Sequence, residues 1–184
     1  FSFHPVKIIT SGEGGIALTN DEEVAVCMRR LRSHGITTDK NLMDPRAKEQ
    51  IWNYQQIELG YNYRMTDIHA ALGLSQLRRL DCYVSSRHKI ANHYHKELSD
   101  TPVALPHQAE NNHSSYHLFP VRIKDGNQRR VYKALLENNI GVNLHYIPVH
   151  LQPFYEKQGF KEGDFPEAEK FFKETISLPI FPNL

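Results

Sequence analysis

The feature that most constrains the fold is one long helical pattern in the middle of the chain, from about Asp67 to Leu98. Thr66 can cap its start. Apolar residues recur along the pattern at helical spacing, with imperfect phase in the middle: Ile68, Leu72, Leu80, Val84, Ala91, Tyr94 and Leu98. Because no heptad is sustained, the pattern predicts a connecting helix, bent or broken, and not a coiled coil. We place a domain boundary near its end, so the predicted domains are residues 1–100 and 101–184.

The segment before this helix combines strand, turn and helix patterns. Residues 1–20 have the pattern of two strands joined by a turn, and the turn contains the glycine-rich run GEGG at residues 12–15. Asn20 or Asp21 is expected to cap a following helix that ends at Gly35 and carries on one face Val24, Met28 and Leu31. Residues 36–60 are polar and aperiodic, and a loop of that length is usually functional or mobile.

The segment after the long helix alternates between strand and helix patterns. Residues 115–123 resemble a strand, residues 128–138 a helix, and residues 142–146 a second strand. Pro166 suits the first turn of a last helix. This order predicts a small α+β domain.

Charge and composition exclude several classes of partner. Lys and Arg number 22 against 21 acidic residues, and this balance gives no electrostatic reason to expect nucleic acid or an anionic membrane as a partner. No apolar run approaches the length of a membrane span. Cys27 and Cys82 show no paired spacing, so a reduced, cytoplasmic protein is expected. The histidines lack the spacing of metal ligands, and no metal site is predicted. Because the chain opens at Phe1 inside a strand pattern, we expect a fragment of a longer protein.

The segment SFHPVK at residues 2–7, followed by TSGEGG at residues 10–15, is the most informative for chemistry. Considered alone, Lys7 beside a glycine-rich turn is a surface lysine. The segment is not a phosphate-binding Walker loop, because the lysine precedes the glycines. Lysine is nevertheless the side chain whose amine condenses with an aldehyde, and it loses its proton readily when it is desolvated.

Three further strings follow in order along the chain. They are GYNYRMTDIHAALG at residues 60–73, HYIPVHLQPFY at residues 145–155 and SLPIFP at residues 177–182. Together with the lysine segment they resemble the motifs of the DegT/DnrJ/EryC1/StrS family, the sugar aminotransferases that use pyridoxal 5'-phosphate and act on nucleotide-linked keto sugars. The resemblance implies an α/β fold of the aspartate-aminotransferase type (fold type I). This chain would hold the end of the large domain and the small C-terminal α+β domain.

The resemblance also assigns roles to residues of the cofactor site. Lys7 would form the Schiff base with pyridoxal phosphate and afterwards move a proton between substrate and cofactor, whose ring is the electron sink. Ser2 matches the family serine that contacts the cofactor phosphate. Asn62 matches an asparagine that reaches the phosphate in the neighbouring subunit, which implies a homodimer with shared active sites. The ordinary alternatives are a strand-surface serine and a turn asparagine.

Substrate contacts are implied for a second group of residues. Arg64 would serve the same phosphate or the sugar diphosphate, although a surface arginine is an equal alternative. The third string lies near the nucleotide-sugar in the family, and hydroxyl and imidazole groups suit hydrogen bonding to a sugar or diphosphate. The candidates in it are His145, Tyr146, His150 and Tyr155. Trp52 is a candidate for stacking on a base or covering the site, with ordinary packing as the alternative.

The function implied is transfer of an amino group, from glutamate, to the keto carbon C4 of a nucleotide-linked deoxysugar in cell-surface polysaccharide or nonulosonic acid biosynthesis. The strings are most similar to those of the transaminases that form UDP-4-amino-4,6-dideoxy-N-acetyl-altrosamine. Three alternatives stay open: a related sugar dehydratase, against which Lys7 argues because that subset carries histidine there; a non-catalytic regulatory or interaction module on the same fold; and an amino-acid aminotransferase. Family members have an N-terminal half that supplies further cofactor contacts. The isolated 184-residue polypeptide is therefore expected to bind cofactor poorly and to be inactive.

Overall fold

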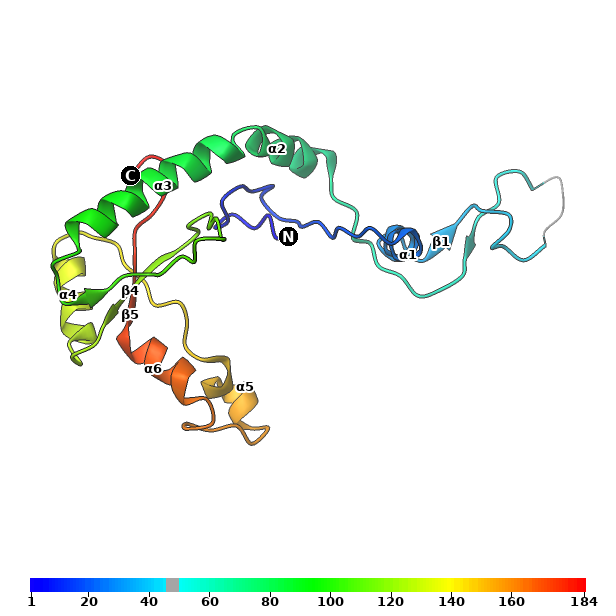
Figure 1. Ribbon diagram of the computed structural model, residues 1–184. Coiled ribbons are helices and arrows are strands. Elements are labelled where there is room, and N and C mark those ends of the chain that lie inside the picture. Colours follow the sequence, from blue (N-terminus) through cyan, green and yellow to red (C-terminus); the bar gives the residue numbers. More distant parts are fainter. Residues whose placement is uncertain (46–49) are drawn as a thin grey trace. The chain divides into compact units, whose positions relative to one another are not determined.

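The structure is a computed structural model that describes residues 1–45 and 50–184. Its contacts divide the chain into two compact units, Phe1–Arg78 and Arg79–Leu184, and each is described by itself (Figure 1). This division rests on contacts between residues. The predicted boundary near residue 100 has another meaning, because it separates a cofactor-binding domain and its connecting helix from a small domain. That boundary stays a prediction.

Helix α1, Glu22–Leu31, begins where the sequence predicted. Of the two candidate caps the structure uses Asp21, whose carboxylate accepts hydrogen bonds from the backbone N–H groups of Glu23 (2.9 Å) and Val24 (3.1 Å). Acidic residues in the first turn and arginines in the last complement the helix dipole. The helix ends at Leu31, and Gly35 follows in the left-handed region with φ of 68°.

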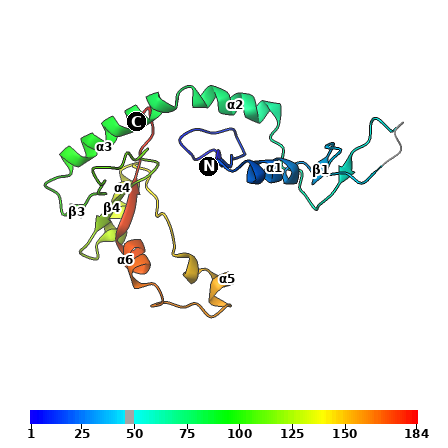
Figure 2. The ribbon, with the colours of Figure 1, turned by 45° about the vertical axis from the view of Figure 1, so that its right-hand side comes forward.

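Two distant segments of the first unit run against each other beyond α1. Strand β1, Ile36–Thr37, pairs antiparallel with β2, Gln55–Gln56 (Figure 2). Next to this pair, the N–H of Tyr61 donates to the Leu31 carbonyl (2.7 Å), and the N–H of His34 donates to the Tyr61 carbonyl (2.8 Å). These hydrogen bonds fix the start of the 60–73 string on the end of α1.

Residues 1–20 do not form the two strands that the sequence predicted. The structure gives only an isolated antiparallel bridge between Ser2 and Gly15. Flanking backbone hydrogen bonds join Phe1 to Ile16 (2.7 and 3.0 Å) and Phe3 to Gly14 (2.9 Å). A strand is defined by its hydrogen-bond partners, and within the described residues this segment pairs only with itself.

The long helical pattern is broken, as the imperfect phase predicted. Helix α2 spans Asp67–Leu77 and helix α3 spans Leu80–Glu97. The Thr66 hydroxyl caps α2 by accepting from the N–H of His69 (3.3 Å), which confirms the predicted cap. Within residues 1–45 and 50–184, no helix combines the length and hydropathy of a membrane span.

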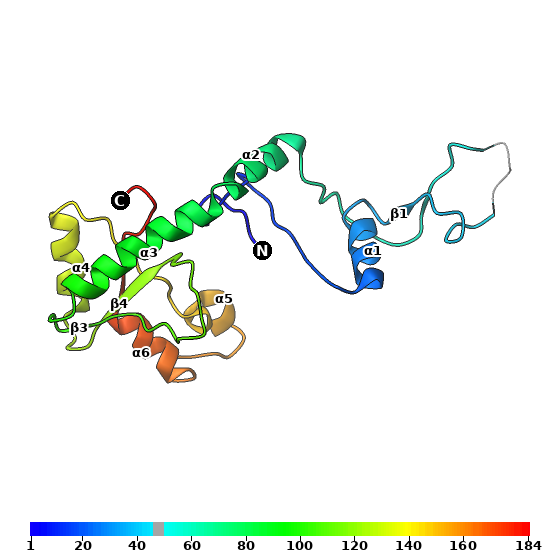
Figure 3. The same cartoon turned by 45° about the horizontal axis from the view of Figure 1, so that its top comes forward.

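The second unit is built on a three-stranded antiparallel sheet in the order β3-β4-β5. The strands are β3, Val103–Ala104; β4, Phe119–Ile123; and β5, Thr175–Leu178. Besides α3, its helices are α4, Gln128–Glu137; the 3₁₀ turn η1, Val149–Leu151; α5, Pro153–Glu156; and α6, Pro166–Glu174 (Figure 3). The predicted helices at residues 128–138 and from Pro166 are confirmed.

The core of this unit lies between α3 and the sheet. Phe119 and Ile176 from neighbouring strands are fully buried, as is Ala91 on α3. The predicted strand over residues 115–123 is shorter in the structure. The one predicted over residues 142–146 is absent, because only Asn143 bridges to β5. The segment is therefore free to leave the sheet after one pair of hydrogen bonds.

Arg87 ties α3 to the last string, residues 177–182. Its side chain is buried, and its guanidinium donates to the backbone carbonyls of Tyr116 (2.9 Å) and Ile180 (2.8 Å). Burial lowers the pKa of Arg87. The Tyr94 hydroxyl donates to the Pro179 carbonyl (2.8 Å) from the same helix. Side chains of α3 thus supply hydrogen bonds to the carbonyls of Pro179 and Ile180, which lie beyond the end of β5.

Candidate active site

Lys7 lies in a turn at the end of a closed loop. The loop is held by the bonds between residues 1–3 and 14–16 and by the Ser11 N–H, which donates to the Phe3 carbonyl (3.0 Å). The Lys7 N–H donates to the His4 carbonyl (2.9 Å), and Pro5 occupies the second position of this turn, where its fixed φ is favourable. In the described part of the chain the half-buried Lys7 side chain makes no hydrogen bond or ion pair. Its amine is therefore not committed to an internal partner.

The glycine-rich run beside Lys7 packs closely on the start of α2. Gly14 has φ of 137°, and a Cβ there would lie 2.6 Å from the Met65 methyl carbon. Ser11 is fully buried, and its hydroxyl donates to the Glu13 carbonyl (2.7 Å). A Cβ on Gly73 of α2 would lie 3.4 Å from the Ser11 Cβ. The structure therefore brings the lysine segment and the 60–73 string together within the first unit.

The other cofactor candidates of the first unit are exposed. The Ser2 hydroxyl accepts a long hydrogen bond of 3.4 Å from the His4 N–H. Asn62 is fixed only by its backbone, which bridges to Ser33. Among residues 1–45 and 50–184 the side chains of Asn62 and Arg64 have no hydrogen-bond or ion-pair partner. Such polar groups can turn to a bound anion without breaking an internal contact. Trp52 is 75% exposed.

His145 and Tyr146 follow Asn143, which forms an isolated bridge with Ser177 of β5. The His145 Nδ1 is 2.9 Å from the Ser177 Oγ, and the Ser177 side chain is buried. The Tyr146 ring meets the His145 ring edge-on at 4.7 Å between centroids and is 68% exposed. Of these two candidates, Tyr146 presents the free polar group.

His150 is buried in a polar pair. It is 7% exposed, and its Nε2 is 2.9 Å from the Glu169 Oε1. The same carboxylate oxygen accepts from the Gly163 N–H (2.8 Å). The hydrogen bond from His150, together with that from Gly163, holds the pKa of Glu169 below its usual value. The His150 ring also packs on Phe165. Within its unit this imidazole is a structural group, and its direct contact with substrate stays a prediction.

Tyr155 closes the third string on α5. It is 37% exposed, and its ring packs against those of Phe154 and Phe160. The eight predicted residues thus fall into two groups. Ser2, Lys7, Asn62 and Arg64 belong to the first unit, and His145, Tyr146, His150 and Tyr155 to the second.

Sequence reasoning missed the partners that hold the two histidines. The sequence marked Ser177 only as a member of the 177–182 string, and it gave Glu169 no feature beyond that of an acidic residue on an amphipathic helix. A usable signal was present for Glu169, because it lies four residues after Phe165 and three before Phe172. Those spacings place it on the same helix face as two aromatic rings.

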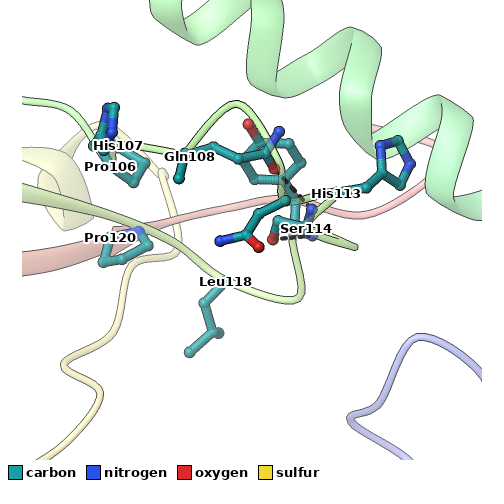
Figure 4. A pocket seen from close by; sticks show the side chains of 10 residues that line it. Pro106, His107, Gln108, His113, Ser114, Leu118 and Pro120 are labelled. Atoms are coloured by element: carbon teal, nitrogen blue, oxygen red, sulfur yellow. Dashed lines mark hydrogen bonds between the residues drawn. The ribbon is translucent and has the colours of Figure 1, made fainter.

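A separate hollow of about 500 Å³ lies in the second unit and contains none of the predicted residues. Figure 4 shows His107, Gln108, His113 and Ser114 around it, with the Ser114 N–H donating to the Gln108 side chain (2.7 Å). No carboxylate or cationic side chain other than histidine lines it. Among the described residues there is also no cluster of His, Cys, Asp and Glu that could hold a metal ion.

The structure thus shows a lysine without an internal partner among the described residues, beside a glycine-rich run in a mixed α/β chain. The chain belongs to the DegT/DnrJ/EryC1/StrS aminotransferase family, whose model matches residues 1–184. It is 39% identical over 194 residues to an uncharacterized protein of Methanocaldococcus jannaschii, covering 100% of this chain and 49% of the relative. It is 37% identical over 183 residues to the UDP-4-amino-4,6-dideoxy-N-acetyl-beta-L-altrosamine transaminase of Campylobacter jejuni, covering 97% and 46%. The chain spans about half the length of these relatives.

Solved structures give the same assignment. Helicobacter pylori PseC, an aminotransferase involved in the biosynthesis of pseudoaminic acid, superposes with a TM-score of 0.86 at 31% identity and covers 100% of this chain and 48% of its own. The PLP form of Spr1654 from Streptococcus pneumoniae has a TM-score of 0.84 at 29% identity, with coverages of 100% and 46%. The predicted fold class is confirmed: the chain has the aspartate-aminotransferase-type α/β fold and corresponds to the C-terminal half of these proteins.

Proposed function

We propose that the protein containing this chain is a pyridoxal-phosphate-dependent aminotransferase that moves an amino group from glutamate to the keto carbon C4 of a nucleotide-linked deoxysugar. Its products would enter cell-surface polysaccharide or nonulosonic acid biosynthesis. The observation that carries the proposal is the uncommitted amine of Lys7, on a closed loop of a chain that matches this aminotransferase family from end to end.

The residues of the first unit fit the chemistry of the cofactor. When bound, pyridoxal phosphate supplies an aldehyde that condenses with a primary amine and a ring that accepts electrons from the substrate carbon. Lys7 offers such an amine without an internal ion pair to break. The exposed hydroxyl of Ser2 and the exposed amide of Asn62 are donors suited to a phosphate. After substrate displaces it, the Lys7 Nζ would hold and return the proton that moves in the transfer.

The second unit offers groups for the sugar nucleotide. Tyr146 presents its hydroxyl to solvent, and Tyr155 is partly exposed. His145 and His150 would complete this group. From the first unit, the cation of Arg64 would serve the cofactor phosphate or the sugar diphosphate. The altrosamine transaminase of Campylobacter jejuni and PseC of Helicobacter pylori support a substrate of this class.

The same family likeness supports a homodimer in which Asn62 reaches the cofactor of the neighbouring subunit. A cytoplasmic location fits the two cysteines, which are free. Both statements belong to the proposal.

The proposal predicts that Lys7 is the site of covalent cofactor attachment. The complete protein would be reduced with borohydride and digested, and the pyridoxyl label is expected on the peptide that contains Lys7. The Lys7→Ala variant should lose amino transfer from glutamate to a UDP-4-keto sugar by at least about 100-fold, because one amine supplies both attachment and proton transfer.

A matched control is Lys40→Ala, which removes an exposed lysine of the same unit. It should keep both the label and the activity. A label on any other peptide, or product from Lys7→Ala at the wild-type rate, would refute the assignment.

A further inference from the structure

The segment 145–150 is held by its two histidines, one near each end. At the first, His145 binds the buried hydroxyl of Ser177 (2.9 Å). The backbones of Asn143 and Ser177 exchange two hydrogen bonds beside it, of 2.8 and 3.3 Å. Because Ser177 lies in β5, this end of the segment is fixed to the central sheet of the second unit.

At the other end, His150 binds a carboxylate that is itself fixed. Glu169 is 5% exposed and lies on α6, and its Oε1 also accepts from the Gly163 N–H. Phe165 covers the imidazole, with the ring centroids 4.8 Å apart. A buried carboxylate with two donors restrains its partner far more than an exposed ion pair, such as Lys173 with Glu162, can do.

Three of the four side chains between these anchors are exposed, and the fourth, Pro148, is buried. Tyr146, Ile147 and Val149 are 68%, 50% and 61% exposed. The two imidazoles are thus engaged in hydrogen bonds inside the unit, while Tyr146, Ile147 and Val149 stay exposed. Such a pattern is typical of a binding loop that is shaped before its ligand arrives, since ordering the loop on binding would cost affinity.

We propose that Glu169 and Ser177 are positioning residues: by holding His150 and His145, they set the place of Tyr146 for the nucleotide-linked sugar. The inference rests on the proposed function. Neither residue needs to touch the substrate, because each acts through its histidine.

The test uses Glu169→Gln in the complete protein, with Glu167→Gln as the matched control. Glu167 lies on the same helix, is exposed and has no partner within the described residues. Glu169→Gln removes the charge that fixes His150 and keeps the size of the side chain. The KM for the sugar nucleotide should rise by about 10-fold with kcat and the glutamate half-reaction unchanged, because only the pre-ordering of the loop is lost. Glu167→Gln should leave all three unchanged.

A second readout does not depend on catalysis. Amide hydrogen exchange of the peptide covering residues 145–155 should accelerate by about 10-fold in Glu169→Gln and not in Glu167→Gln. Ser177→Ala removes the hydroxyl that holds His145. It should likewise raise the KM for the sugar nucleotide and accelerate amide exchange of residues 145–155. It serves as the test if Glu169→Gln does not fold.

The outcomes separate this inference from the proposed function. Faster exchange with an unchanged KM would overturn the positioning role, as would an equal loss in the glutamate half-reaction, which would indicate general damage. If the wild-type protein transfers no amino group at all, the proposed function fails instead, and the exchange data show whether the anchors still hold the loop.

Discussion

Gly60 and Gly141 differ in what surrounds their α-carbons. A Cβ on Gly60 would lie 2.1 Å from the backbone nitrogen of Gly35 and 2.8 Å from the Leu31 carbonyl oxygen. Backbone atoms cannot yield as a flexible side chain can, so the methyl group must push the two segments apart. A Cβ on Gly141 would meet nothing within 4 Å.

We therefore expect Gly60→Ala to destabilise the complete protein by about 1–3 kcal/mol, the usual cost of overpacking. Gly141→Ala should be neutral within about 0.5 kcal/mol. Urea unfolding of both variants measures the difference. Equal midpoints for the two would contradict the close approach of residues 31–35 and 60.

The predictability of the candidate site also differs residue by residue. Lys7, Ser2 and Asn62 could be predicted as site residues because their neighbours in sequence form strings that resemble the motifs of the family, and these assignments stay predictions. Ser177 and Glu169 were not assigned roles, because their partners lie 32 and 19 residues away in the chain. The spacing of Glu169 to Phe165 and Phe172 places it on the aromatic face of its helix, but it does not show which residue of the chain pairs with it.

At the level of elements, the helices were predicted best because their signals are local. Asp21 caps α1, Thr66 caps α2 and Pro166 begins α6, each as the sequence indicated. The strands were predicted poorly. A strand exists only with a partner, and the pairing of β4 with β5 joins residues that are far apart in sequence. The alternating pattern of residues 142–146 leads instead to a single bridge.

Arg87 of α3 is the element-scale contact that most directly fixes the 177–182 string. Among the described residues it has no carboxylate partner and its Nε has no hydrogen bond, so its role rests on the carbonyls it binds. Arg87→Met leaves those carbonyls buried without a donor. We expect the free energy of unfolding to fall by about 2 kcal/mol. This figure includes a partial gain, because the variant no longer has to bury a charge.

The control for Arg87→Met is Lys89→Met, two residues along α3, which removes an exposed charge. It should change stability by less than about 0.5 kcal/mol. Chemical unfolding of both variants provides the measurement, and hydrogen exchange over residues 177–182 should rise only in Arg87→Met. An unaffected 177–182 peptide would show that the string is held by other contacts.

At the level of the whole molecule, exposed apolar residues concentrate on α2. Ile68, Leu74 and Leu77 are 81%, 58% and 53% exposed, and the helix has no polar face to present to water. Exposed apolar side chains gathered in this way are typical of a surface that packs against further protein. The relatives are about twice the length covered here, and the proposed homodimer would add a second copy.

The homodimer with shared sites predicts complementation between two inactive variants. If Asn62 serves the neighbouring subunit, Lys7→Ala and Asn62→Ala each impair both sites of their own homodimers. In a heterodimer of the two variants, one site has both residues intact and the other has neither. The purified heterodimer should therefore have about half of the wild-type activity per site, because one of its two sites is intact.

The experiment co-expresses the two variants of the complete protein with different tags and measures amino transfer by the purified heterodimer. Pairing Lys7→Ala with the double variant Lys7→Ala/Asn62→Ala is the control, because no site then contains the lysine and activity should stay absent. A heterodimer of the two single variants that is also inactive would show that each site takes Lys7 and Asn62 from one and the same subunit. The two residues would then act within one subunit, and the shared active site would be wrong even if the chemistry of Lys7 is right.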